Sequence, residues 1–229
     1  EGNLAVLAHY GPIYRPDIVL LYQGSIEIQD LSKLSFAPVP TSSGEAPGAW
    51  HRGTLDPIQQ VLEATTLFAH LSQSVRTRLM AAKQLEDGLP APALAIFRQR
   101  VQQFLATTRA LGAQPVLSTF AARYTSDQYA AFDDELFRSQ LRYNPYLSRR
   151  GWLVSIDQLN QEIRAVAAAE QVPLLDVAAV VAGDAAVFRD FSHFSKLGHQ
   201  RVAATLAAGL QPLWSQRAPL ASVHTGAAP

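Results

Sequence analysis

The sequence predicts an α/β fold, a three-layer α/β/α sandwich built around a parallel sheet, and three observations support this class. Residues 18–22 form an apolar run without polar alternation, which is typical of a strand covered by helices on both faces. Two amphipathic helical stretches later in the chain each lead into another apolar run. The connections between them are short, as parallel α/β units require.

The first part of the chain is expected to contain a helix, a strand and a loop. Residues 3–10 have helical character, and we expect Gly11-Pro12 to end that helix before the strand at 18–22. Residues 23–27 should then form a loop at the carboxyl end of the strand, where open α/β sheets bind their ligands.

The next stretch lacks strands. Residues 36–51 are rich in Pro, Ser, Gly and Ala, so we expect a long surface loop or lid. Asp56-Pro57 is typical of an N-cap followed by a proline at the first helical position, and it predicts a helix to about Val75.

The second half of the chain predicts two helix-strand units and a final helix. A helix carrying apolar residues from Phe97 to Leu111 leads into a strand at 115–120, and a helix over about 156–166 leads into a strand at 172–177. Between the two units lies an insertion rich in aromatic residues, from Tyr124 to Tyr146. A loop at 190–196 then precedes a helix from Leu197 to about Trp214.

Composition limits the possible functions. The chain has 19 basic and 19 acidic residues and no basic run, so nucleic acid is not an expected partner. It has no cysteine, which excludes disulfides, thiolate metal sites and a cysteine nucleophile but leaves the compartment open. No run of apolar residues is long enough to span a bilayer. We expect a single domain over residues 1–217 and a disordered tail over 218–229.

The pattern with the clearest chemical meaning is Asp190-Phe191-Ser192-His193, followed by a glycine and a histidine that open the last helix. An imidazole can take a proton from a serine hydroxyl, and a carboxylate at its other nitrogen fixes the tautomer and stabilises the imidazolium. In this pattern His193 would be the general base and Asp190 the residue that orients it.

Together with its neighbours, this pattern resembles the last sequence block of the SGNH (GDSL-type) hydrolases. The resemblance extends from Tyr14 to about Leu210 and includes a Pro-Asp before the strand that ends in Tyr22-Gln23-Gly24. It also includes the strand ends at Ser118-Thr119 and Leu175-Asp176, in family order. The resemblance implies a flavodoxin-like α/β/α fold and hydrolysis of small-molecule or glycan esters without a cofactor.

Two features depart from the family pattern. The serine nucleophile should lie in a Gly-Asp-Ser block, but the nearest match is Gly183-Asp184-Ala185, and we expect the serine and the first strand to precede Glu1. The block that supplies an oxyanion donor aligns with residues 24–27, so Gly24 marks the oxyanion region. Ile26 replaces the family's asparagine and has no donor, and such a loss typically costs about 10²–10³ in turnover.

Several alternatives stay open. Ser25 follows a strand and a glycine, so it is a second candidate nucleophile. Asp190, His193 and His199 have the residue types of a zinc site but not its spacing, so no metal is expected. The chain could also be a non-catalytic SGNH-fold protein that binds or scaffolds, or an acyltransferase of the polysaccharide O-acetylation type. Ile26 favours the hypothesis of a non-catalytic protein.

Overall fold

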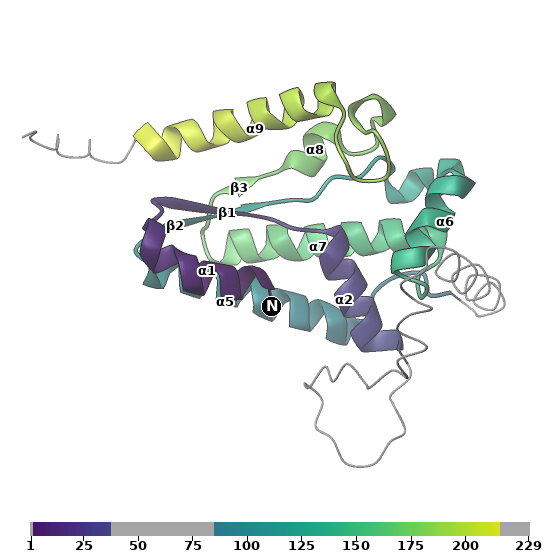
Figure 1. Cartoon of the computed structure of the whole chain (residues 1–229), viewed down its shortest axis with the longest axis horizontal. Coiled ribbons are helices and arrows are strands. Elements are labelled where there is room, and N and C mark those ends of the chain that lie inside the picture. The colour runs from purple at the N-terminus through teal and green to yellow at the C-terminus, as the bar shows by residue number, and fades with distance from the viewer. Residues whose placement is uncertain (1, 38–84, 216–229) are drawn as a thin grey trace, which may run out of the picture. The chain divides into compact units, whose positions relative to one another are not determined.

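The computed structural model describes residues 2–37 and 85–215 (Figure 1). The predicted helix after Asp56, the tail at 218–229 and nearly all of the predicted loop at 36–51 lie outside the described residues. The chain divides into two compact units, and the single domain predicted for residues 1–217 stays a prediction. The first unit comprises Glu1–Gln23, Val101–Tyr124 and Ile163–Pro229, and the second comprises Gly24–Arg100 and Thr125–Glu162.

The first unit contains a parallel sheet of three strands in the order β1-β2-β3, which confirms the α/β class. The strands are β1 (Ile18–Tyr22), β2 (Gln114–Ser118) and β3 (Leu174–Leu175). Leu20 pairs with Val116, and Leu117 pairs with Leu174. The central strand is the most buried, as a run of apolar residues predicts. Among the described residues, no strand pairs with the outer edge of β1.

The predicted strand at 172–177 is too long. Only Leu174 and Leu175 pair with β2, because the Asp176 side chain accepts a hydrogen bond from the backbone N–H of Ala179 and so caps a short helix, α8 (Val177–Val181). An aspartate at this position competes with strand pairing by starting a helix.

The first helix, α1 (Gly2–Tyr14), continues past the position where Gly11-Pro12 was expected to end it, so that boundary was wrong. Gly11 packs directly on Leu111, where a Cβ would lie 2.3 Å from the leucine Cδ1. The glycine is therefore explained by close packing rather than by helix termination. The helix ends where the N–H of Arg15 donates to the carbonyl of Gly11, with Arg15 at a φ of 45°.

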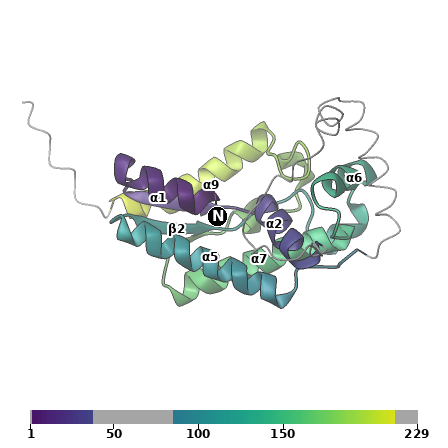
Figure 2. The same ribbon diagram turned by 60° about the horizontal axis from the view of Figure 1, so that its bottom comes forward.

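The last described helix packs on β3. After α8 come a short 3₁₀ helix, η2 (Ala185–Val187), and the helix α9 (Lys196–Ser215), close to its predicted bounds. Gly209 lies against the side chain of Leu175, which brings α9 onto the sheet. Figure 1 and Figure 2 both place α9 on one side of the sheet, with the part of the helix α5 (Ala91–Ala110) that belongs to this unit on the other.

Two predicted amphipathic helices are confirmed, and each runs through both units. They are α5 (Ala91–Ala110) and α7 (Arg149–Ala169). In the first unit Arg109 pairs with Glu170, and in the second Arg98 pairs with Glu162, so the helices are bridged within each unit. None of the helices within the described ranges is both long and apolar enough to cross a membrane.

The second unit is helical, and it corrects the predicted loop at 23–27. Ser25 already opens α2 (Ser25–Phe36), because Ile28 and Leu31 share a buried face and Glu27 forms an ion pair with Arg100 of α5. The aromatic-rich insertion forms η1 (Ser126–Ala131) and α6 (Asp134–Tyr143).

Candidate functional site

The loop between η2 and α9 reverses the chain within a few residues. Phe188 and Phe194 form an antiparallel bridge, and their ring centroids lie 5.1 Å apart. Within this reversal the N–H of Arg189 donates to the carbonyl of His193 over 2.8 Å. The backbone therefore brings Asp190 and His193 to the same tip.

Asp190 is fixed by its own loop. Its Oδ1 accepts hydrogen bonds from the backbone N–H groups of Ser192 (3.0 Å) and His193 (2.9 Å). Aspartate side chains commonly bond the backbone two or three residues on, and the turn that results holds the carboxylate in one orientation. The carboxylate is therefore held facing the imidazole.

The expected contact between Asp190 and His193 is present. The imidazole Nδ1 lies 2.8 Å from Oδ2 and 3.0 Å from Oδ1 of the carboxylate. Because an ionised carboxylate only accepts hydrogen bonds, Nδ1 carries the proton and Nε2 keeps its lone pair in the neutral ring. Nε2 has no hydrogen-bond partner in the part of the chain that the structure describes, and the His193 side chain is 81% exposed. The arrangement leaves one imidazole nitrogen of His193 open to a ligand.

The electrostatics of the pair keep Asp190 ionised. Partial burial, the largest single effect, raises the pKa of the carboxyl, but the hydrogen bonds from the backbone of His193 and Ser192 and from the His193 side chain together outweigh it. The net result is a pKa below the ordinary value for aspartate. An ionised carboxylate is the form that can stabilise an imidazolium.

The loop is attached to the carboxyl end of β2. The N–H of Arg123, five residues beyond the end of β2, donates to the carbonyl of Phe191 over 2.9 Å. The preceding residue, Ala122, accepts from the N–H of Gly183 over 3.0 Å. The side chain of Phe191 is buried, so Asp190 and His193 flank an anchored residue. This is the edge at which open α/β sheets carry their ligand sites.

Gly198, in the first turn of α9, lets the helix approach the loop closely. A Cβ at this position would lie 2.0 Å from the carbonyl oxygen of Val187 and 3.0 Å from Cβ of Phe194. Backbone cannot move as a flexible side chain can, so any other residue here would displace the helix from the loop. Gly198 is therefore explained by the close packing of α9 against the loop.

The imidazole of His199 contacts the carbonyl of Ser195, not the carboxylate of Asp190. Its Nδ1 lies 2.9 Å from the carbonyl oxygen of Ser195, and its ring contacts Phe194 edge-on. Across residues 2–37 and 85–215, no three His, Asp or Glu side chains gather as metal ligands. His199 therefore serves to fix the start of α9.

The residues aligned with the oxyanion block belong to the second unit. Gly24 is buried and its carbonyl accepts from the N–H of Ile28, while Ser25 begins the helix. Ile26 is 69% exposed, and Glu27 is buried in its ion pair with Arg100. Within this unit, residues 24–27 therefore act as a helix start held by a salt bridge.

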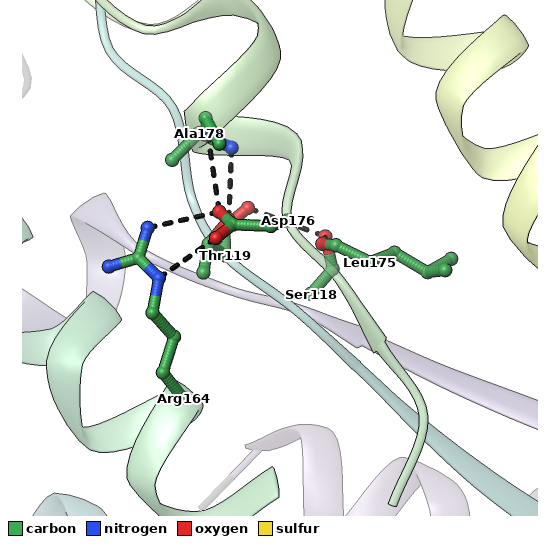
Figure 3. A network of polar contacts seen from close by, with 7 residues as sticks. Ser118, Thr119, Arg164, Leu175, Asp176 and Ala178 are labelled. Carbon is green, nitrogen blue, oxygen red and sulfur yellow. Dashed lines mark hydrogen bonds and ion pairs between the residues drawn. The ribbon is translucent and has the colours of Figure 1, made fainter. Parts of the chain in front are cut away.

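The structure also contains a polar network that the sequence did not predict, at the ends of β2 and β3 (Figure 3). Thr119 donates to Oδ1 of Asp176 over 2.7 Å and accepts from the N–H of Ala178 over 2.9 Å. Arg164 binds both carboxylate oxygens of Asp176, over 2.9 and 3.0 Å. Asp176 alone had a sequence signal, as an aspartate before a helix.

This network is structural in character. The hydrogen bond from Arg164, the largest effect, lowers the pKa of Asp176, and the bonds from Thr119 and Ala179 add to it against the opposing effect of burial. Every hydrogen-bond donor to Asp176 among the described residues belongs to the same unit. Asp176 therefore ties β2, β3, α7 and α8 together.

No family model matches this chain, and no curated protein or solved structure shows significant similarity to it. Inference about function therefore depends on the geometry of the residues themselves.

Proposed function

We propose that this chain is the His-Asp-bearing part of an SGNH-type serine hydrolase that acts on carboxylic esters. The observation that carries the proposal is the imidazole of His193, held at Nδ1 by Asp190 and open at Nε2. A ring held in this way is what a serine nucleophile needs from its base. The proposed fold is the three-layer α/β/α sandwich, with α8 and α9 forming one layer beside the sheet.

In the proposed reaction, Nε2 of His193 takes the proton of a serine hydroxyl while the serine oxygen attacks the ester carbonyl carbon. The imidazolium then returns that proton to the leaving alcohol as the ester bond breaks. Water repeats the two steps on the acyl-serine and releases the acid. Asp190 stays ionised and stabilises the imidazolium in each step.

The serine is proposed to precede Glu1, on a strand that pairs with the outer edge of β1. Two features support this position. That edge has no strand partner among the described residues, and the residues of β1 are less buried than those of β2. A parallel strand added there would end at the same edge of the sheet as β1 and β2, where the Asp190 loop is anchored.

One observation favours a second candidate, a non-catalytic SGNH-fold protein that binds or scaffolds. Ile26 stands where the family pattern has its asparagine, and its apolar side chain cannot donate to an oxyanion. A protein that had lost catalysis would tolerate this replacement, whereas an enzyme must supply the donor from another residue.

The deciding experiment is labelling of the full-length protein with a fluorophosphonate probe, followed by mass spectrometry of the labelled peptide. The proposal expects one labelled serine, and expects His193→Ala to abolish its labelling. His199→Ala is the matched control, because it removes an imidazole from the same segment without touching Asp190, and it should label normally. Absence of any labelled serine, or equal labelling without His193, would reject catalysis and favour the binding protein.

A further inference from the structure

Arg123 lies beside the Asp190–His193 loop and has no role in the proposed proton transfer. Its backbone N–H donates to the carbonyl of Phe191, which lies between the two residues of the pair. The side chain is partly buried, and its guanidinium carbon lies 5.8 Å from the centre of the Tyr124 ring. Arg123 therefore follows the carboxyl end of β2, and its backbone is bonded to the loop that carries the candidate site.

Among the described residues, the Nε atom of Arg123 lacks the hydrogen-bond partner that its burial calls for. This atom is inaccessible to solvent, and within residues 2–37 and 85–215 no carboxylate forms an ion pair with the guanidinium. A buried donor left unsatisfied is destabilising, and such an atom in a native fold requires an explanation.

Comparison with the other described arginines of the same unit shows that a partly buried guanidinium without a carboxylate partner is unusual here. Arg109, Arg164 and Arg201 each pair with a carboxylate. Arg15 and Arg189 form no ion pair among the described residues, but both are exposed, so water can hydrate them. Arg123 combines partial burial with the lack of an anion, which is the condition expected of a cation that awaits a ligand.

We propose that Arg123 binds an acidic group of the substrate, a carboxylate or a phosphate carried on the same molecule as the ester. The planar guanidinium matches the oxygens of either anion and gains charge-assisted hydrogen bonds from them. A cation–π contact with the Tyr124 ring, 5.8 Å from the guanidinium carbon, already holds the side chain, so less freedom is lost on binding. This inference rests on the proposed esterase and narrows its substrates to acidic esters.

The test is an NMR titration of the full-length protein labelled with ¹⁵N at the arginine side chains. Glucuronate supplies the carboxylate, glucose is its uncharged counterpart, and inorganic phosphate supplies the second anion. We expect a saturable shift of the Arg123 Nε–H signal with at least one anion and none with glucose. Arg123→Gln should weaken that binding by about tenfold or more, whereas Arg189→Gln should leave it unchanged.

The outcomes separate the two anions and the two proposals. A response to glucuronate alone assigns carboxylate esters, and a response to phosphate alone assigns phosphate-bearing esters. No saturable shift, or equal shifts at Arg15 and Arg189, would overturn the inference, and the wild-type signal decides this even if the glutamine variant does not fold. If the protein binds an anion but no serine is labelled by the fluorophosphonate, the Arg123 site stands and the hydrolase is rejected. If a serine is labelled but no anion binds, the hydrolase stands and the Arg123 site is rejected.

Discussion

Asp190 and Asp176 are two aspartates of the same unit with very different surroundings. Hydrogen bonds lower the pKa of both. Asp176 gives its oxygens to Arg164, Thr119 and a helix N-terminus, which are fixed parts of the fold. Asp190 holds an imidazole that is 81% exposed and whose other nitrogen has no partner among the described residues. The comparison shows that the partner of a carboxylate, more than its pKa, separates a structural aspartate from a candidate for catalysis.

The largest expected difference between the two concerns turnover in the full-length protein. Asp190→Asn should lower kcat by about 10⁴, because an amide can donate to Nδ1 and so favour the wrong tautomer. Asp176→Asn should lower kcat less than tenfold, because its network does not reach the proton that is transferred. Steady-state hydrolysis of an activated ester measures both. Equal losses would mean that the distinction drawn between the two carboxylates is wrong.

Stability should show the opposite order, with a larger loss of unfolding free energy at Asp176 than at Asp190. Asp176→Ala removes the cap of α8 and leaves Arg164 and Thr119 without their shared acceptor, so the free energy of unfolding should fall by about 2 kcal/mol. Asp190→Ala should cost under about 1 kcal/mol, because the pair it breaks is largely exposed. Urea unfolding monitored by circular dichroism checks the two values, and a larger loss at Asp190 would contradict the comparison.

The pH dependence of stability follows from the direction in which the pKa values of Asp176 and Asp190 are shifted. Both folded-state pKa values lie below the ordinary value of 3.8, so the carboxylates stabilise the fold above that value and the stabilisation is lost as pH falls through the folded pKa. The free energy of unfolding should therefore decrease from about pH 5 towards about pH 2, with each carboxylate contributing under about 1 kcal/mol because solvent screens it. Asp176→Asn should flatten this decrease. A variant with an unchanged pH profile would show that Asp176 is not one of the responsible groups.

The smallest effect is expected at His199. His199→Ala should change the free energy of unfolding by less than about 0.5 kcal/mol, because the ring is exposed and gives up one bond to a carbonyl and an edge contact with Phe194. Hydrolysis should also be unaffected by the variant and by a chelator. Loss of activity in the His199→Ala variant or in the presence of a chelator would support a metal site made of Asp190, His193 and His199.

The parts of the fold that local sequence determines could be predicted. Residues 18–22 form a strand because their side chains are apolar, and the helix around Ile156 follows from its spacing. The strand predicted at 115–120 is present as β2, but it ends at Ser118. The end of the first helix could not be predicted, because Gly11 is explained by contact with Leu111, far along the chain. The loop expected after Tyr22 is a helix, since an ion pair between Glu27 and a distant arginine holds its first turn.

The candidate site divides in the same way. The contact between Asp190 and His193 could be predicted because the two residues lie three apart in a segment that resembles the last sequence block of the SGNH hydrolases. Arg123 and the network around Asp176 could not, because Thr119 and Asp176 are 57 positions apart and Arg123 meets Phe191 only after β2 and the loop have packed. Long-range pairs carry no local pattern.

The parallel pairing of β1 with β2 has a consequence for how the protein is made. Ile18 is hydrogen-bonded in register with Gln114, so the first strand must wait while the ribosome adds about a hundred further residues. During that interval five consecutive apolar side chains have no sheet to join. Contacts so distant in sequence slow folding, and they expose the nascent chain to capture by chaperones or by other unfinished copies.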